Sequence, residues 1–254
     1  MISIKSREEI EIMRAGGRIL ADVLQKVGKS VKPGTSAAQL DKLARELVFS
    51  LGARPSFLDY KPGGSGEGYP AALCVSINDE IVHGLPDKKC RLKNGDIISL
   101  DLGAEYNGVY TDMATTIAVG NVTTEIKNLL INTKKSLQLG IFEAYSGQHV
   151  GDIGAKIEEF ASTSGLGIIR DYVGHGIGTK PHLPPQIPNF GTPGTGVEIV
   201  ENMALAIEPM LTLGGEGTKI GADGWVVKTA DGSLAAHFEH TIIIENGQPL
   251  IVTQ

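Results

Sequence analysis

The apolar positions of the chain follow an order of elements that occurs twice. Two segments with an apolar residue at every third or fourth position, as in amphipathic helices, precede shorter segments favourable to strands, and this order returns in the second half. The first two helices are expected between Ser6 and Lys32 and between Ser36 and Gly52, and the next two around 126–141 and 150–165. The repetition predicts two similar halves that face each other across a site.

Both helices of the first half begin with a capping-box pattern. Ser6 precedes Glu9 and Ser36 precedes Gln39, so each serine can accept a hydrogen bond from the backbone amide three positions later, while that residue's side chain caps the serine amide. The apolar face of the first helix follows at Ile10, Met13, Leu20, Val23, Leu24 and Val27. Local chemistry and periodicity therefore predict the same helix starts.

Strands and loops are expected after each helix pair. In the first half, we expect a glycine-rich surface loop at 61–70, a strand at 72–77 and a turn that holds His83. In the second half, we expect a strand at 167–172, a proline-rich loop to about Pro193, an apolar segment at 203–213, and a hairpin of 225–229 and 234–244 that turns at Asp231-Gly232.

A hairpin with two acids stands between the halves. Strands at 100–106 and 109–115 are joined by Asn107-Gly108, a dipeptide typical of a two-residue type I′ turn. Counting outward from this turn places Gly103 opposite Asp112 and Asp101 opposite Ala114. The two carboxylates then project from one side as diagonal neighbours, and Gly103 leaves a gap between them that ions could fill.

This hairpin has two interpretations. Like charges that point together repel unless a cation lies between them, which favours a metal site. The alternative is a solvated hairpin with an aspartate at two strand positions. Three later residues bear on the choice, because Glu208 and Glu239 interrupt apolar segments where an unpaired charge is costly, and His175 lies in a glycine-rich turn. Together these five side chains favour metal.

Composition narrows the class of protein. The 254 residues carry a net charge of −6, which argues against nucleic-acid binding through a generally basic surface. Cys74 and Cys90 have neither CxxC spacing nor a disulfide pattern, which favours a reducing compartment. We see no signal peptide and no apolar run of membrane-spanning length, so we expect a soluble cytoplasmic protein without a membrane partner.

The motifs, taken in order, resemble those of the methionine aminopeptidases over nearly the whole chain. They are Gly68-Tyr69-Pro70, Ser76-Ile77-Asn78, His83-Gly84-Leu85-Pro86, Asp101-Leu102-Gly103 with Asp112, Gly174-His175-Gly176-Ile177-Gly178 with His182, Ile207-Glu208-Pro209, and Phe238-Glu239-His240-Thr241. The short segment between Glu208 and Glu239 resembles the bacterial type I enzymes, since it leaves no room for the helical insertion of type II. We also see no N-terminal extension or extra domain of the prolidase kind.

The resemblance implies a fold and a set of ligands. The fold is the α+β pita-bread (creatinase/aminopeptidase) fold, with residues 1–254 as one catalytic domain of two pseudo-symmetric helix-helix-strand halves around a central antiparallel sheet. Asp112 and Glu239 would bridge two divalent ions, Asp101 would complete one site, and His175 with Glu208 the other. The ions could be Co, Mn, Fe(II) or Zn, and the oxygen-rich ligand set favours the first three over a thiolate-type zinc site.

The resemblance also implies an activity. The ions would activate a shared hydroxide that removes the initiator methionine from nascent polypeptides with a small second residue. Glu208 would shuttle protons, and His83 and His182 would contact the peptide and stabilise the tetrahedral intermediate. The expected partners are nascent N-termini, with possible ribosome association, for a monomer that binds no specific nucleic acid.

The pocket for the methionine side chain matches the family in part. Tyr69, Cys74 and Trp225 stand at family pocket positions, although a lone tryptophan could also be a hydrophobic plug in its strand. Gly66 and Glu67 replace an aromatic residue and a histidine that are frequent in bacterial type I enzymes, and Pro181 replaces an aromatic residue before His182. These departures predict a pocket with fewer aromatic walls.

Two other functions remain open at this point. The first is a broader or proline-directed peptidase with the same fold, which a panel of dipeptides would distinguish. The second is a non-catalytic module of this fold that binds a protein or ribosomal RNA. Such modules typically lose ligands, whereas all five ligand positions here carry a competent residue.

Overall fold

The computed structural model describes residues 2–61, 66–87 and 89–254. Its helices are α1 (Arg7–Lys29), α2 (Ala37–Ser50), α3 (Thr124–Glu143) and α4 (Val150–Thr163). Its strands are β1 (Arg54–Pro55), β2 (Cys74–Ile77), β3 (Glu80–Val82), β4 (Ile97–Tyr106), β5 (Val109–Ala118), β6 (Gly167–Ile168), β7 (Gly174–Gly176), β8 (Leu183–Ile187), β9 (Ala204–Ile207), β10 (Met210–Thr212), β11 (Thr218–Ile220), β12 (Val227–Thr229), β13 (Ala235–His237), β14 (Glu239–Glu245) and β15 (Gln248–Ile251). None of the described helices is long and apolar enough to cross a membrane.

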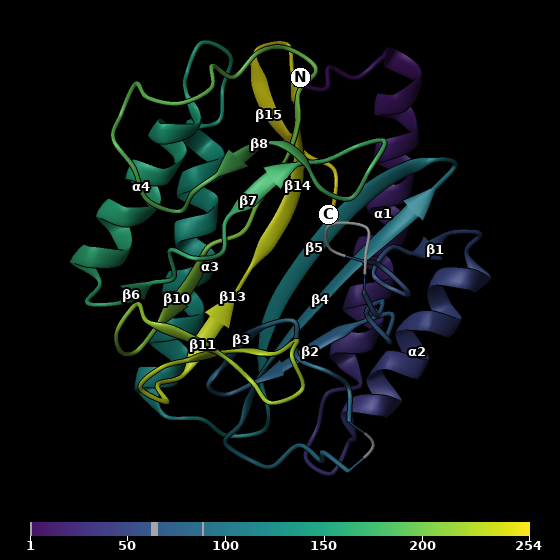
Figure 1. The fold of residues 1–254 in the computed structure, drawn as a ribbon, viewed down its shortest axis with the longest axis vertical. Helices are drawn as coiled ribbons and strands as arrows, with labels where there is room; N and C mark the ends of the chain where they lie inside the picture. The colour runs from purple at the N-terminus through teal and green to yellow at the C-terminus, as the bar shows by residue number, and fades with distance from the viewer. Residues whose placement is uncertain (1, 62–65, 88) are drawn as a thin grey trace.

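A central antiparallel sheet joins the two halves of the chain. Its main order is β1-β4-β5-β14-β9-β7-β8, with β2 added on β4 and β15 on β14. The helix pair α1 and α2 lies on one side in Figure 1 and the pair α3 and α4 on the other. Strands β4 and β5 come from the first half and β9 and β7 from the second, so β14 lies where the halves meet. The α+β class and the repeated helix order are confirmed.

Each helix pair covers its own apolar core. The first core joins α1 and α2 to β2 and β4, and includes Leu20, Leu24, Leu40 and Leu100. A second core joins α3 and α4 to β9, β10 and β14. Both predicted capping boxes are formed, with Ser6 Oγ accepting from Glu9 N at 3.2 Å and Glu9 Oε2 accepting from Ser6 N at 2.7 Å in the first.

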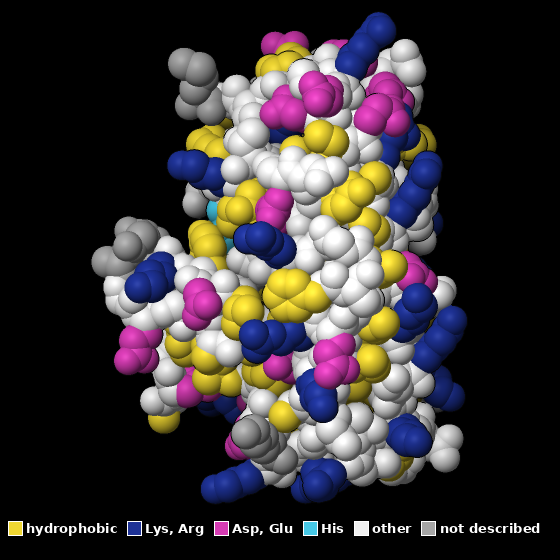
Figure 2. Space-filling model, turned by 90° about the vertical axis from the view of Figure 1, so that its right-hand side faces the viewer, with side chains coloured by type: hydrophobic (Ala, Val, Ile, Leu, Met, Phe, Trp, Pro, Cys, Tyr) yellow, Lys and Arg dark blue, Asp and Glu magenta, His cyan; other side chains and the backbone are white. Residues whose placement is uncertain are grey.

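Charge is mixed on the surface that carries α1 and α2. Figure 2 shows this side with Lys and Arg interspersed among Asp and Glu, and with apolar side chains scattered between them. This face is therefore not uniformly basic, as expected from the net charge of −6.

The hairpin of β4 and β5 has the predicted register. Tyr106 pairs with Val109, Gly103 with Asp112, and Asp101 with Ala114. Asn107 and Gly108 have φ angles of 49° and 81°, as a type I′ turn requires at both central positions. The strands extend beyond the predicted ones, because Ile97 and Ala118 still pair at the far end of the ladder.

Three predictions for the connecting segments are wrong. The expected strand 167–172 shortens to β6, and the proline-rich loop contains β8, which pairs with β7. Prolines are tolerated there because β8 lies at the sheet edge, where one row of amides needs no partner strand. The expected hairpin of 225–229 and 234–244 does not form, because β12 pairs with β11 and β3, β13 pairs with β10, and β14 joins the central sheet.

Two predictions for the first half are confirmed. β2 covers most of the expected strand 72–77, and His83 follows β3 in a left-handed conformation that is typical of turns, with a φ of 59°. In the predicted glycine-rich loop, positions 62–65 lie outside the described residues, and 66–70 form no helix or strand.

Candidate metal centre and substrate pocket

The antiparallel register brings the five candidate ligands together. Ala114 on β5 pairs with Asp101 on one side and with Glu239 on the other, so these carboxylates flank one residue. Asp112 lies two positions along β5 and therefore on the same face of the sheet. In the second half, His175 pairs with Ala206, and Glu208 follows two positions later. Both halves thus supply one side chain opposite an alanine and one carboxylate two positions away.

The candidate ligand atoms form overlapping groups. Asp101, Asp112 and Glu239 make one group, and His175, Glu208 and Glu239 make another, with the ligand atoms in each group within 4.8 Å of one another. A third group contains Asp112, His175 and His182 under the same limit. Glu239, Asp112 and His175 are each shared between two groups. Of these three, the two carboxylates have two acceptor oxygens each and could contact two ions, whereas a neutral imidazole offers one acceptor nitrogen.

Burial and mutual repulsion make the ionised form of these four carboxyl groups unfavourable when no cation is bound. Burial raises the pKa of Asp112 and of Glu208 to about 8, with the Glu208 carboxylate adding to the effect on Asp112. The pKa values of Asp101 and Glu239 also rise well above their usual range through burial and the neighbouring carboxylates. In the described part of the chain, the basic side chains within 4.0 Å of these four carboxylates are His175 and His237, and both lie next to Glu208.

The donor chemistry fits a divalent cation. Asp101 Oδ1 and Glu239 Oε1 are buried without a hydrogen-bond partner in the described structure, which is costly for carboxylate oxygens. Burial, reinforced by His182, lowers the pKa of His175 to about 3 and keeps its imidazole neutral, the form that binds metals. Four carboxylates and a neutral imidazole are a hard set of ligands suited to Mn, Fe(II) or Co(II).

The space above Gly103 is not an ion cavity, contrary to the sequence-based expectation. A Cβ atom built on Gly103 would lie 2.0 Å from Ser56 Oγ and 3.0 Å from Phe57 Cε1. The missing side chain therefore admits the segment after β1, which is anchored by a hydrogen bond of 2.9 Å from Ser56 N to Gly103 O. Gly103 lets the Phe57 ring approach the sheet and form part of the pocket wall.

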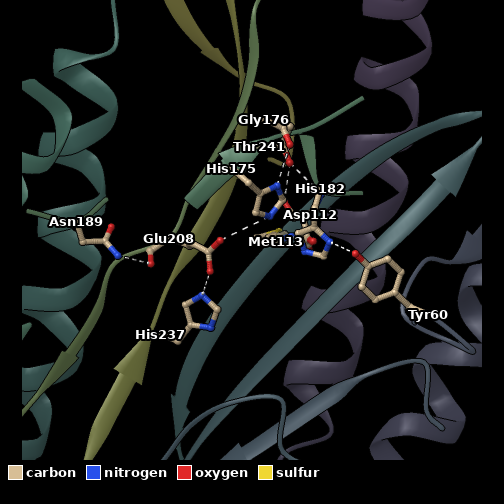
Figure 3. A network of polar contacts seen from close by, with 10 residues as sticks. All are labelled: Tyr60, Asp112, Met113, His175, Gly176, His182, Asn189, Glu208, His237 and Thr241. Carbon is tan, nitrogen blue, oxygen red and sulfur yellow. Dashed lines mark hydrogen bonds and ion pairs between the residues drawn. The ribbon is translucent and has the colours of Figure 1, made fainter. Parts of the chain in front are cut away.

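Glu208 lies between two imidazoles. Its Oε1 is 3.6 Å from His175 Nε2, and its Oε2 is 3.5 Å from His237 Nε2 (Figure 3). Asn189 Nδ2 donates to the backbone carbonyl of Glu208 at 3.1 Å. His237 belongs to none of the motifs, although its spacing of two positions from Glu239 indicates a side chain on the same face.

His182 and His83 reach the same cavity from loops. His182 Nδ1 lies 2.8 Å from the Tyr60 hydroxyl, and its ring packs edge-on against His175 at 4.4 Å between centroids. Burial, with smaller effects of His237 and His182, lowers the pKa of His83 to about 4, so its imidazole is neutral. The structure thus brings both predicted histidines to the candidate ligands.

A cavity of about 490 Å³ opens above the acids. The predicted pocket residues Tyr69, Cys74 and Trp225 all line it, and the Tyr69 and Trp225 rings meet edge-on at 5.2 Å. The Tyr69 hydroxyl donates to Gly84 O at 2.7 Å, which fixes the ring.

Aromatic side chains line the cavity at positions other than 66, 67 and 181. Gly66 and Glu67 are exposed, and Pro181 does not line the cavity. Phe57, Tyr60 and Tyr172 supply aromatic walls, and a pocket with fewer such walls than other bacterial type I enzymes stays a prediction. These three residues lie outside the matched motifs and approach the site only through the fold, so no motif indicates them.

Comparisons with known proteins agree with this geometry. The model of metallopeptidase family M24 matches residues 11–246. A methionine aminopeptidase of Clostridium acetobutylicum is 44% identical over 253 residues, covering 100% of this chain and 99% of that protein, and one of Aquifex aeolicus is 46% identical over 257 residues, covering 100% and 99%. The crystal structure of a methionine aminopeptidase from Thermotoga maritima superposes with a TM-score of 0.95 at 43% identity, and each chain covers 100% of the other.

These matches confirm the family resemblance and the pita-bread fold. The site geometry and the comparisons also agree on a metal-dependent peptidase, since the family consists of metallopeptidases and the clustered acids and histidines can hold metal. This chain belongs to metallopeptidase family M24, and within it to the methionine aminopeptidases.

Proposed function

We propose that this enzyme removes the initiator methionine from nascent polypeptides whose second residue is small. The observation that carries the proposal is the position of the candidate metal ligands at the base of an aromatic cavity. Within the cavity of about 490 Å³, Tyr69, Cys74 and Trp225 form part of the wall where an apolar side chain can pack. The names of the relatives support methionine as that side chain.

The ligand arrangement supports two divalent ions. Asp101 would hold one ion, His175 and Glu208 the other, and the shared residues Asp112 and Glu239 would contact both. When bound, such ions supply a nucleophilic water near neutral pH and polarise the scissile carbonyl. The choice among Co, Mn, Fe(II) and Zn is left to metal reconstitution.

The remaining residues bind and orient the peptide. Tyr69 and Trp225 would enclose the first side chain, with their rings held by the contact at 5.2 Å. His83 and His182 line the cavity beside the candidate ligands and can donate hydrogen bonds toward the oxygen of the scissile carbonyl as charge develops on it. Tyr60 fixes the ring of His182 through its hydroxyl. Glu208, whose carboxylate lines the cavity, can accept a proton from the attacking water and return it to the leaving amine.

A peptide panel tests the proposal. Protein reconstituted with Mn(II) or Co(II) should release methionine from Met-Ala and Met-Gly peptides but not from Met-Leu peptides, and it should not release leucine from Leu-Ala peptides. Comparable rates on peptides with leucine or proline in second place would instead support a broader or proline-directed peptidase. Absence of bound or restorable divalent metal after dialysis would favour a module that only binds a partner.

Further parts of the proposal concern the cellular setting. We place the enzyme in the cytoplasm as a monomer, with residues 1–254 as a single catalytic domain that acts on N-termini as they leave the ribosome. Sedimentation of the purified protein with and without ribosomes tests the monomer and the association together. A stable dimer would contradict the monomer, and a lack of cosedimentation at physiological salt would contradict the ribosome association.

A further inference from the structure

His237 is a buried histidine that the mechanism above does not use. It ends β13, its side chain is 2% exposed, and neither ring nitrogen has a hydrogen-bond partner in the described structure. Buried imidazole nitrogens without partners are costly, so a chain that keeps one at such a position requires an explanation. The carboxylate nearest to its ring in the described structure is that of Glu208, at 3.5 Å from Nε2.

We propose that His237 is a positioning residue that holds the Glu208 carboxylate by donating from Nε2 to Oε2. This inference deepens the proposed function and rests on it. The separation of 3.5 Å is at the long limit for a hydrogen bond. Hydrogen bonds of catalytic groups are often long in the unliganded protein and tighten in the working complex.

The opposite side of Glu208 shows why its orientation matters. Oε1 faces His175 Nε2 at 3.6 Å, on the side of the candidate metal ligands, while Oε2 faces His237 (Figure 3). A donor at Oε2 therefore fixes the torsion that keeps Oε1 directed toward the site. Asn189 holds the Glu208 backbone at its carbonyl, so the backbone and the side chain are fixed by different partners.

A direct role of His237 as a metal ligand does not fit its position. The candidate groups of ligand atoms in the described chain include His175 and His182 but not His237. A neutral imidazole carries one N–H, which is enough for one hydrogen bond to a carboxylate oxygen. His237 therefore acts through Glu208, as residues that orient metal-binding carboxylates do elsewhere.

Two substitutions separate positioning from packing. His237→Leu fills the space but removes the donor, and His237→Gln keeps an N–H donor. We expect His237→Leu to lower kcat on a Met-Ala peptide by about 10-fold to 100-fold with KM nearly unchanged. In a calorimetric titration, His237→Leu should also bind the more weakly held Mn(II) ion about 10-fold to 100-fold less tightly than wild type. His237→Gln should restore most of the lost kcat and most of the lost Mn(II) affinity.

His240→Leu is the matched control, because His240 is a half-buried histidine nearby that contacts Thr253 Oγ1 at 2.9 Å rather than Glu208. It should lower thermal stability while leaving Mn(II) affinity unchanged. Equal Mn(II) affinity in wild type and His237→Leu, or equal losses in the Leu and Gln variants, would overturn the proposal. The titration needs no peptide, so a failure of the proposed substrate specificity would be seen separately.

Discussion

Thr241 on β14 binds both backbone groups of Asp112 on β5. Its Oγ1 accepts from Asp112 N at 2.8 Å and donates to Asp112 O at 2.8 Å. In the backbone ladder between these strands, Glu239 pairs with Ala114 and His240 pairs with Met113. At the next position, the Thr241 hydroxyl takes the place of a backbone partner for Asp112. It thereby fixes Asp112, a candidate bridging ligand, where the two halves of the fold meet.

Replacing Thr241 by valine should loosen Asp112. The substitution keeps the shape but leaves a buried N–H and C=O without partners, which costs about 1–3 kcal/mol. We expect a lower Tm and a weaker affinity for Mn(II), measured by thermal melting and calorimetry. Thr241→Ser keeps the hydroxyl and should stay close to wild type in Mn(II) affinity. If both variants bound Mn(II) equally well, the hydroxyl would not position Asp112.

The sequence could predict the acid hairpin because a local rule sets its register. Asn107-Gly108 dictates which residues face each other, so the shared side of Asp101 and Asp112 follows from counting. The contacts of Tyr60 could not be predicted in this way, because its partner His182 lies 122 positions away. No local pattern encodes such a contact.

The errors have the same origin. β8 has a sequence typical of a loop and becomes a strand only because β7 offers an edge. The gap at Gly103 was correctly placed on the acid face, but its occupant comes from a distant segment after β1. Local chemistry thus predicts where a side chain points, and tertiary packing decides what it meets.

Asp112→Asn should stabilise the metal-free protein while abolishing activity. The substitution removes one of several buried carboxylates that repel each other, so the free energy of unfolding without metal should rise at pH about 8, where Asp112 is half ionised. A gain of about 1 kcal/mol would raise Tm by roughly 2–4 °C in a chain of this size. With Mn(II) the order should reverse, because wild type gains more from the ion. A lower Tm of the metal-free variant would argue against repulsion in the cluster.

The metal-free protein should lose stability as pH rises from 6.5 to about 8. Asp112 and Glu208 have folded-state pKa values raised to about 8, so the stability they contribute is complete below their unfolded pKa values and is lost as pH rises through 8. His175 and His237 have pKa values lowered to about 3, so their contribution grows as pH rises and is complete above 6.5. The two effects oppose each other below pH 6.5, and of these four groups only the two carboxyl groups still change the stability above it.

Urea unfolding of EDTA-treated protein across this window measures the effect. The free energy of unfolding should fall with rising pH, with a shallower fall in Asp112→Asn. Saturating Mn(II) should remove the fall, because bound cations favour the ionised carboxylates. If the free energy of unfolding of the metal-free wild type stayed constant or rose across this pH range, the pKa values of Asp112 and Glu208 would not be raised.

Gly103→Ala should damage the pocket without touching a candidate ligand. Its Cβ would lie 2.0 Å from Ser56 Oγ and 3.0 Å from Phe57 Cε1, so the segment after β1 must move away from the sheet. Overpacking of this kind costs about 1–3 kcal/mol. Since Phe57 lines the cavity, KM for a Met-Ala peptide should rise while Mn(II) affinity stays unchanged. Ser56→Ala removes the closest atom, so the double variant should recover part of the stability and of KM. Additive losses in the double variant would mean that the Ser56 contact is not the source of the damage.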